Sequence, residues 1–206
     1  MSTEIVSEAP AAYGVMKHIS DTLEPWRTQT HWTEEEYLAL ETNRLVEFID
    51  GKLEELPMPD YIHQTIADLF KDALKTHESF KAGGRVVGAP FRLNLPNGNY
   101  REPDVLYLKK EHLRMFGNAA WTGADLVLEI ISPGGKKRDT VDKRLDYAKA
   151  GISEYWIIDP EPRTITVLKL VGTQYIEHGN FTLGQVATSV LLPGFSVDVT
   201  AVFEAK

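Results

Sequence analysis

The chain has 206 residues, and its 30 acidic and 22 basic residues give a formal net charge of −8 at pH 7. This acidic balance argues against a protein that coats nucleic acid nonspecifically, because contacts to phosphate dominate such binding. The absence of Cys excludes disulfides and thiolate metal sites and fits the cytoplasm, and no apolar run reaches the roughly 18–20 residues that cross a membrane.

The first segment of the chain is expected to be a flexible N-terminal arm. Residues 1–30 show no sustained hydrophobic period and contain Ala-Pro and Glu-Pro breaks. Residues 31–206 then suffice for a single domain with a sizeable core. Thr33 and Glu36 have the spacing of a capping box, which predicts a short helix through about Glu41. Three of its residues are expected in the core: Tyr37, Leu38 and Leu40.

A hairpin and a long helix follow. Asp50-Gly51 lies between two short strands over residues 44–49 and 52–56, and this dipeptide is the strongest short-range hairpin signal. From about Asp60 to His77 apolar residues recur at helical spacing, so one face of this helix should lie in the core. The residues of this face are Ile62, Ile66, Leu69, Phe70, Ala73 and Leu74.

The rest of the chain alternates strands with one helix. The predicted elements are strands over residues 85–95, 101–108, 126–131 and 154–159, a connection over 109–122, and a helix over 136–150 that Gly151 ends. Residues 164–169 alternate like an exposed-edge strand, and short strands and a helical turn follow, ending near residue 203. This order predicts an α/β domain on a mixed sheet. The strands on either side of the helix should be parallel, because the helix forms a crossover between them.

Three acidic residues stand where strands should be apolar: Glu47, Asp104 and Glu129. An ionised carboxylate inside a buried strand is costly unless a cation or hydrogen-bond donors meet it. Carboxylates on neighbouring strands are also the ligands that Mg²⁺ needs, and Mg²⁺ usually takes one or two of them beside water and substrate phosphate. The residues alone leave two interpretations open, a metal site or carboxylates that pair with Arg or cap a turn.

The order of short motifs resembles that of a nuclease family. Pro103-Asp104, followed by Glu129 inside an apolar strand, is similar to the PD-(D/E)xK signature of restriction-endonuclease-like nucleases. More specifically, the chain resembles the Uma-type family of restriction endonucleases from about residue 33 to 203. The matching motifs are Glu47-Phe-Ile-Asp-Gly51, His63, Pro103-Asp-Val105, Leu126-Val-Leu-Glu-Ile-Ile-Ser-Pro133, Arg138-Asp139, Lys143, Tyr147, Ala150-Gly151, Glu154-Tyr-Trp-Ile-Ile-Asp-Pro160 and Leu192-Pro-Gly194.

The resemblance implies a restriction-endonuclease-like α-β-β-β-α-β core on a mixed sheet, with an N-terminal helix and hairpin. It also implies hydrolysis of DNA phosphodiester bonds that depends on Mg²⁺, with Mn²⁺ as a substitute. Asp104 and Glu129 would hold the metal, and Glu47 would add a third carboxylate to the catalytic site. Positioning of substrate or water is assigned to His63, Gln64 and Tyr147.

One position departs from the signature, whose lysine should stand two residues after the glutamate. Ile131 occupies this position. The basic role is therefore expected to pass to Lys143 on the next helix, with Lys136 or Lys137 as substitutes.

Helical geometry sets a condition on Lys143. The core stripe of its helix is predicted to consist of Val141, Leu145 and Ala148. At about 100° per residue, Lys143 points away from that stripe and shares its face with Tyr147. Lys143 can reach the carboxylates only if this face also meets the protein, for example under the hairpin that carries Glu47. The alternative is a solvated lysine paired with Asp139 or Asp146.

Structural alternatives also stay open for the other site residues. They are turn capping for Asp104, solvent exposure for Glu47, an ion pair with Arg85 or Arg92 for Glu129, and packing at the helix edge for His63. Tyr155 and Trp156 are expected in the core rather than on a base-stacking surface.

The functional expectation is a divalent-metal-dependent endonuclease that hydrolyses DNA by a metal-activated water. The rival is a catalytically weak or inactive nuclease-fold protein that binds nucleic acid or a protein partner, which Ile131 and the acidic charge favour. A third hypothesis is a structural subunit whose acidic cluster is only an ion-pair network. Short edge strands near the C-terminus would also allow a homodimer.

Overall fold

The computed structural model describes residues 28–205, and His31–Lys206 forms one compact unit. The arm predicted over residues 1–30 lies, except for its last three residues, outside the described range. Among the described residues no helix is both long and apolar enough to cross a membrane.

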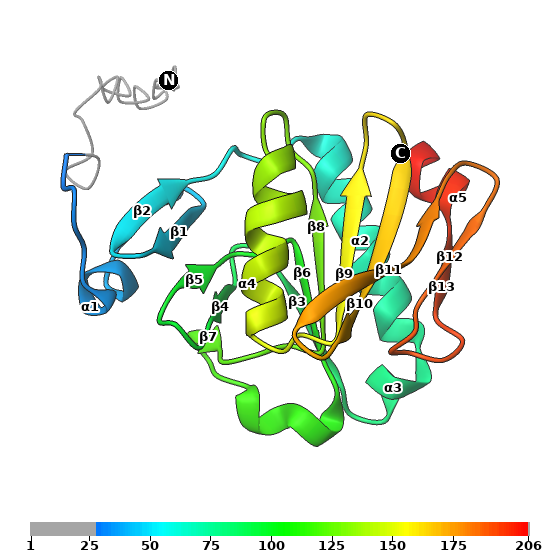
Figure 1. The fold of residues 1–206 in the computed structure, drawn as a ribbon, viewed down its shortest axis with the longest axis horizontal. Helices are drawn as coiled ribbons and strands as arrows, with labels where there is room; N and C mark the ends of the chain where they lie inside the picture. Colours follow the sequence, from blue (N-terminus) through cyan, green and yellow to red (C-terminus); the bar gives the residue numbers. More distant parts are fainter. Residues whose placement is uncertain (1–27, 206) are drawn as a thin grey trace, which may run out of the picture. The chain divides into compact units, whose positions relative to one another are not determined.

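A six-stranded mixed sheet forms the centre of this unit, with the order β11-β10-β9-β8-β6-β3 (Figure 1). Its strands are β3 (Arg85–Gly88), β6 (Val105–Leu108), β8 (Leu126–Ile130), β9 (Glu154–Asp159), β10 (Thr164–Val171) and β11 (Gln174–Phe181). As predicted, β8 and β9 are parallel, and the other neighbours are antiparallel. The prediction of an exposed edge at β10 is wrong, because the chain turns at Gly172 and β11 pairs along the outer side of β10.

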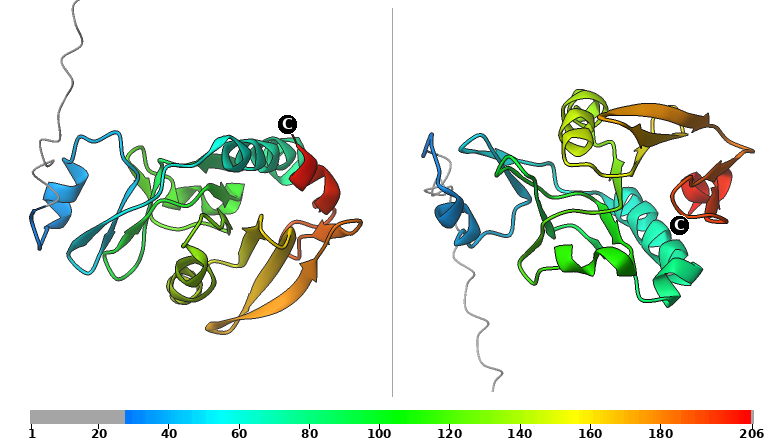
Figure 2. Two further views of the ribbon diagram at one scale, coloured as in Figure 1. Left: turned by 90° about the horizontal axis from the view of Figure 1, so that it is seen from above. Right: turned by 60° about the horizontal axis from the view of Figure 1, so that its bottom comes forward.

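Two helices cover the opposite faces of this sheet (Figure 2). Helix α2 (Tyr61–Thr76) begins at the capping residue Asp60 and buries Ile66, Phe70 and Leu74 against one face. Helix α4 (Lys143–Lys149), which continues a π-helical turn over Arg138–Asp142, lies on the other face. The predicted order α-β-β-β-α-β is thus present as α2, β3, β6, β8, α4 and β9.

A second sheet carries the N-terminal hairpin. It has the order β2-β1-β5-β4-β7, with strands β1 (Val46–Ile49), β2 (Lys52–Glu55), β4 (Arg92–Asn94), β5 (Tyr100–Arg101) and β7 (Ala120–Trp121). The hairpin turn at Asp50-Gly51 is confirmed, and both residues have positive φ. The remaining elements are α1 (Glu34–Leu38), α3 (Glu78–Lys81), a 3₁₀ helix (Lys110–Met115), the pair β12 (Val186–Thr188) and β13 (Ser196–Asp198), and α5 (Val199–Glu204).

Two predicted strands are each divided between the two sheets. Residues 85–95 split into β3 and β4 around Pro90, and residues 101–108 split into β5 and β6 around Pro103. Proline has no N–H for a strand ladder, so pairing stops at each of these residues. The second break places Asp104 at the junction of the two sheets, directly before β6.

In the first two helices, two predicted core residues are exposed instead. The capping box of Thr33 and Glu36 forms, but α1 is a single turn that buries Tyr37 and leaves Leu38 exposed. Ile62 lies in the first turn of α2, where the helix borders a groove instead of the sheet, and it is 57% exposed.

Candidate active site

Glu129 lies on the face of β8 that α4 covers. Side chains alternate along a strand, so Leu126, Leu128 and Ile130 pack toward α2, while Val127 and Glu129 point to the opposite side. Glu129 is buried, as the apolar strand around it predicts. Its carboxylate must therefore find its partners inside the protein.

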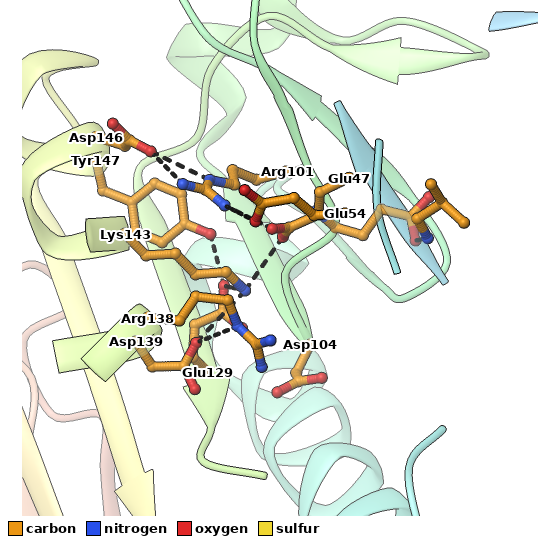
Figure 3. A network of polar contacts seen from close by, with 12 residues as sticks. Glu47, Glu54, Arg101, Asp104, Glu129, Arg138, Asp139, Lys143, Asp146 and Tyr147 are labelled. Carbon is orange, nitrogen blue, oxygen red and sulfur yellow. Dashed lines mark hydrogen bonds and ion pairs between the residues drawn. The ribbon is translucent and has the colours of Figure 1, made fainter. Parts of the chain in front are cut away.

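Lys143 is the cation that meets Glu129. Its Nζ lies 2.8 Å from Oε1 of Glu129, 3.2 Å from Oε1 of Glu47 and 3.7 Å from Oδ1 of Asp139 (Figure 3). Lys143 is only 1% exposed. The Tyr147 hydroxyl, one turn further along α4, donates a hydrogen bond to the same Glu129 oxygen. The condition that the sequence set on Lys143 is met, because its helical face lies against the protein.

The predicted core stripe of this helix is wrong for two of its three residues. Val141 is 45% exposed and Leu145 is 56% exposed, whereas Ala148 is buried. The buried face carries Asp139, Lys143 and Tyr147. Lys143 and Tyr147 donate to the carboxylate on β8, and Asp139 lies 3.7 Å from the Lys143 ammonium. Leaving Glu129 without a cation would cost more than exposing two aliphatic side chains, so electrostatics determines the orientation of the helix.

Glu47 on β1 is held from two sides. Its Oε2 accepts a hydrogen bond from Arg101 at 2.6 Å, and its Oε1 accepts one from the backbone N–H of Glu102 at 3.1 Å. Arg101 also donates to Asp146 of α4, at 2.6 and 3.1 Å. Arg101 thus joins the hairpin sheet to the helix, and Glu47 contacts Lys143 instead of facing solvent.

Asp104 is fixed by contacts from both core elements that flank it. Its Oδ2 accepts the backbone N–H of Ile130 at 2.7 Å, and its Oδ1 lies 2.8 Å from Nε2 of His63. His63 is in the first turn of α2, where its own N–H is capped by Asp60. These contacts orient Asp104 toward the end of β8 without filling all of its oxygen lone pairs.

Asp104 and Glu129 line the same small cavity, of about 20 Å³. A space of roughly 10–15 Å³ accommodates one water-sized particle. The cavity is also lined by His63, Ser132, Arg138, Asp139, Lys143 and Glu102. Glu47 is not among its lining residues.

The donor set of this cavity fits a hard divalent cation. Mg²⁺ usually takes one or two carboxylates and completes its shell with water and phosphate oxygens. Two carboxylates, from Asp104 and Glu129, are in place. Within residues 28–205 no group of three His, Cys, Asp or Glu side chains is arranged to hold a metal ion, so the third carboxylate expected from Glu47 is not part of a preformed cage.

Burial and charge shift the pKa values of the cluster in opposite directions. Burial raises the pKa of Glu129 to about 8, although Lys143 opposes this shift. Burial also tends to lower the pKa of Lys143, but the charges of Glu129, Glu47 and Asp139 outweigh it and raise that pKa above its usual range. Burial would raise the pKa of Glu47 as well, yet Lys143 and Arg101 hold it below its ordinary value. The cluster therefore keeps Lys143 and Glu47 ionised, while Glu129 is harder to ionise than an exposed glutamate and depends on Lys143 for its charge.

Several other residues named from the sequence lie away from the cavity. Gln64 is exposed on α2, and Lys137 is exposed as well. Lys136 lies at the surface, 2.9 Å from Asp159. The alternative arginine partners of Glu129 are engaged elsewhere, since Arg85 donates to backbone carbonyls and Arg92 lies near Glu102 and over the Tyr37 ring. Tyr155 and Trp156 are core residues, as predicted.

Sequence reasoning gave no role to three residues of the site. Arg101 and Glu102 directly precede the Pro103-Asp104 motif, and Arg138 precedes Asp139, so their positions beside recognised motifs were the available signal. Burial raises the pKa of Glu102 to about 7, although a hydrogen bond from the Val46 N–H opposes this.

Comparison with known proteins supplies the relationship that the geometry suggests. A family model described as "Uma2: Putative restriction endonuclease" matches residues 34–200. Among solved structures, a putative nuclease belonging to DUF820 from Anabaena variabilis matches with a TM-score of 0.69 and 21% sequence identity. The match covers 83% of this chain and 97% of the other chain, and at that identity it establishes the fold. No curated protein matches the sequence.

We predict that Lys143→Met lowers the free energy of unfolding by about 3–5 kcal/mol, because it leaves buried carboxylates without their cation. Urea denaturation measures this change. The same replacement at the exposed Lys136 should leave stability unchanged. Adding Glu129→Gln to Lys143→Met should restore part of the loss. Equal urea midpoints for Lys143→Met and Lys136→Met would show that the buried ion pair does not stabilise the fold.

The raised pKa of Glu102 predicts a pH-dependent stability. Between about pH 4.5 and pH 7 the folded protein retains a proton on Glu102 that the unfolded chain releases. The free energy of unfolding should therefore fall as pH rises through this window, by up to about 3 kcal/mol. Denaturation of Glu102→Gln at several pH values should show a flatter profile than the wild type, and identical profiles would contradict the prediction.

Proposed function

The chain belongs to the Uma2 family, and we propose that it is a divalent-metal-dependent endonuclease that hydrolyses DNA phosphodiester bonds. In this proposal, the carboxylates of Asp104 and Glu129 bind Mg²⁺ or Mn²⁺. The family and the fold support a nuclease of the restriction-endonuclease type. The metal, the DNA substrate and the residue roles are the proposed part.

One observation carries the proposal. The strand position at which the PD-(D/E)xK signature has a lysine is Ile131, yet the ammonium of Lys143 lies 2.8 Å from the Glu129 carboxylate. It lines the same cavity as Asp104. A lysine on the neighbouring helix thus brings positive charge to the two carboxylates that the signature requires.

The side chains divide the work in the following way. A bound divalent cation would neutralise charge on the phosphate and lower the pKa of an attacking water. Asp104 is kept in orientation by the Ile130 N–H and His63, and Glu129 by Lys143 and Tyr147. Fixed ligands lose little freedom when they bind, which favours affinity. Lys143 supplies positive charge where negative charge develops on the phosphate.

Glu47 acts in this scheme through Lys143. Its carboxylate is tied to Arg101 and to the Glu102 backbone, and the remaining contact is with the Lys143 ammonium. It therefore positions the lysine from the hairpin side instead of binding metal itself. His63 has the corresponding role for Asp104.

A second function, binding without cleavage, is favoured by the ion pairs that already occupy the cluster. Lys143 already pairs with the Glu129 carboxylate, and the cavity of about 20 Å³ leaves little room for a hydrated ion. If these ion pairs exclude a metal ion, the protein would retain the nuclease fold and bind nucleic acid or a partner without cleaving. A measurement of metal binding therefore distinguishes the two functions.

We expect DNA to be cleaved in Mg²⁺ or Mn²⁺ when plasmid and single-stranded DNA are tested side by side, and EDTA to stop the reaction. Asp104→Asn and Glu129→Gln should each lower the rate by about 100-fold or more, because each removes a charged oxygen ligand. Asp142→Asn, at an exposed position close to the cluster, is the matched control and should cleave like the wild type. Cleavage that survives both ligand changes would place the active site elsewhere.

Calorimetric titration with Mn²⁺ tests the site without relying on activity. The wild type should bind one equivalent, and Asp104→Asn should bind it more weakly by about tenfold or more. Asp142→Asn should again match the wild type. Absence of binding in the wild type would favour the non-cleaving function.

A further inference from the structure

An apolar groove opens beside the catalytic cavity. Its volume is about 670 Å³, within the range of small-molecule sites. It lies between the start of α2 and the turns that follow β8 and β9, which gather at the top of Figure 1. Its lining overlaps that of the cavity in four residues: Pro57, Pro59, His63 and Ser132. A ligand whose phosphate reaches Asp104 and Glu129 would therefore extend directly into the groove.

The groove has stiff apolar walls. Four of its lining residues are prolines: Pro57, Pro59, Pro133 and Pro160. Proline fixes its own φ, so these walls do not need to be ordered when a ligand enters. Met58 and Ile62 are each 57% exposed and also line the groove. Such a surface suits a flat apolar face, as a nucleobase has.

The charges of the groove disfavour phosphate. Asp60, Asp159 and Glu161 line it, and the charge of Lys136 is already paired with Asp159 at 2.9 Å. Acidic groups repel the backbone of a nucleic acid, but a carboxylate accepts hydrogen bonds from the N–H groups of base edges. The groove therefore complements a base rather than the sugar-phosphate chain.

We propose that this groove binds the base of an unpaired nucleotide next to the scissile phosphate. This inference rests on the proposed nuclease function, and it narrows the substrate to single-stranded DNA or a strand with an extruded nucleotide. A base inside a duplex is stacked and paired, so it cannot enter such a groove without being unstacked. The acidic net charge agrees with a substrate held through a base, since little affinity then has to come from phosphate contacts.

Fluorescence anisotropy of the full chain tests the proposal. The probes are a labelled single strand with hydrolysis-resistant phosphorothioate linkages, the same strand with abasic sites, and the matching duplex, all in Mg²⁺. The single strand should bind more tightly than the duplex. Ile62→Asp and Met58→Asp should each weaken its binding by about tenfold, because each replaces apolar surface that the base contacts with a charged group.

Two controls separate base binding from simple charge repulsion. Leu145→Asp introduces the same charge at an equally exposed apolar site on α4, outside the groove, and should bind like the wild type. On the abasic strand, Ile62→Asp should have no further effect, because the group that the groove contacts is already missing. Equal binding of duplex and single strand, or an equal loss on the abasic strand, would overturn the proposal.

Cleavage assays distinguish failure of the groove from failure of the nuclease. If the single strand binds through the groove but is not cleaved in Mg²⁺ or Mn²⁺, the proposal that the groove binds a base is supported and the proposed nuclease function is wrong. If duplex DNA is cleaved and Ile62→Asp leaves the rate unchanged, the nuclease function is supported and the proposal that the groove binds a base is wrong.

Discussion

The buried carboxylate of Glu129 is the constraint on which the rest of the site depends. It stands on a central strand with a helix packed over each face of the sheet, so bulk water cannot stabilise its charge. The only cation that reaches it among the described residues comes from α4, and this contact fixes which face of the helix lies inward. Exposure of Val141 and Leu145 is the consequence. The ion pair between Lys143 and Glu129, and not the apolar stripe of the helix, therefore determines how α4 packs on the sheet.

The same ion pair links parts of the chain that local forces would leave separate. Lys143 belongs to the helix on the central sheet, whereas Glu47 belongs to the hairpin of the second sheet. Arg101 provides a second link between the hairpin and α4, because it contacts both Glu47 and Asp146. Buried ion pairs add little net stability compared with apolar packing, but they are specific in geometry. Their effect here is to hold the hairpin, β8 and α4 in one arrangement.

The fold was largely predictable because its main elements carry local signals. Asp50-Gly51 determines the hairpin, the period of α2 determines its buried face, and the crossover helix makes β8 and β9 parallel. The errors occur where distant residues decide the outcome. Pro90 and Pro103 mark where two predicted strands pass between sheets, yet a sequence does not show that a second sheet exists. Likewise, the contact of Glu47 with Arg101 joins residues far apart in the chain, so no spacing rule could have found it.

The position of Lys143 shows how a covering helix can supply positive charge to a carboxylate on the strand below it. A lysine at position 131 would have projected from the strand that carries Glu129, and β-strand alternation would have placed both side chains on one face. Ile131 instead packs with the core residues on the α4 side, and the ammonium arrives from the helix that covers the same face. The cavity then receives the same charge from a different element, and the end of β8 is left apolar. That apolar end, together with Ser132 and Pro133, forms one wall of the neighbouring groove. A lysine on the helix therefore brings positive charge to the Glu129 carboxylate and leaves the surface beyond the end of β8 apolar.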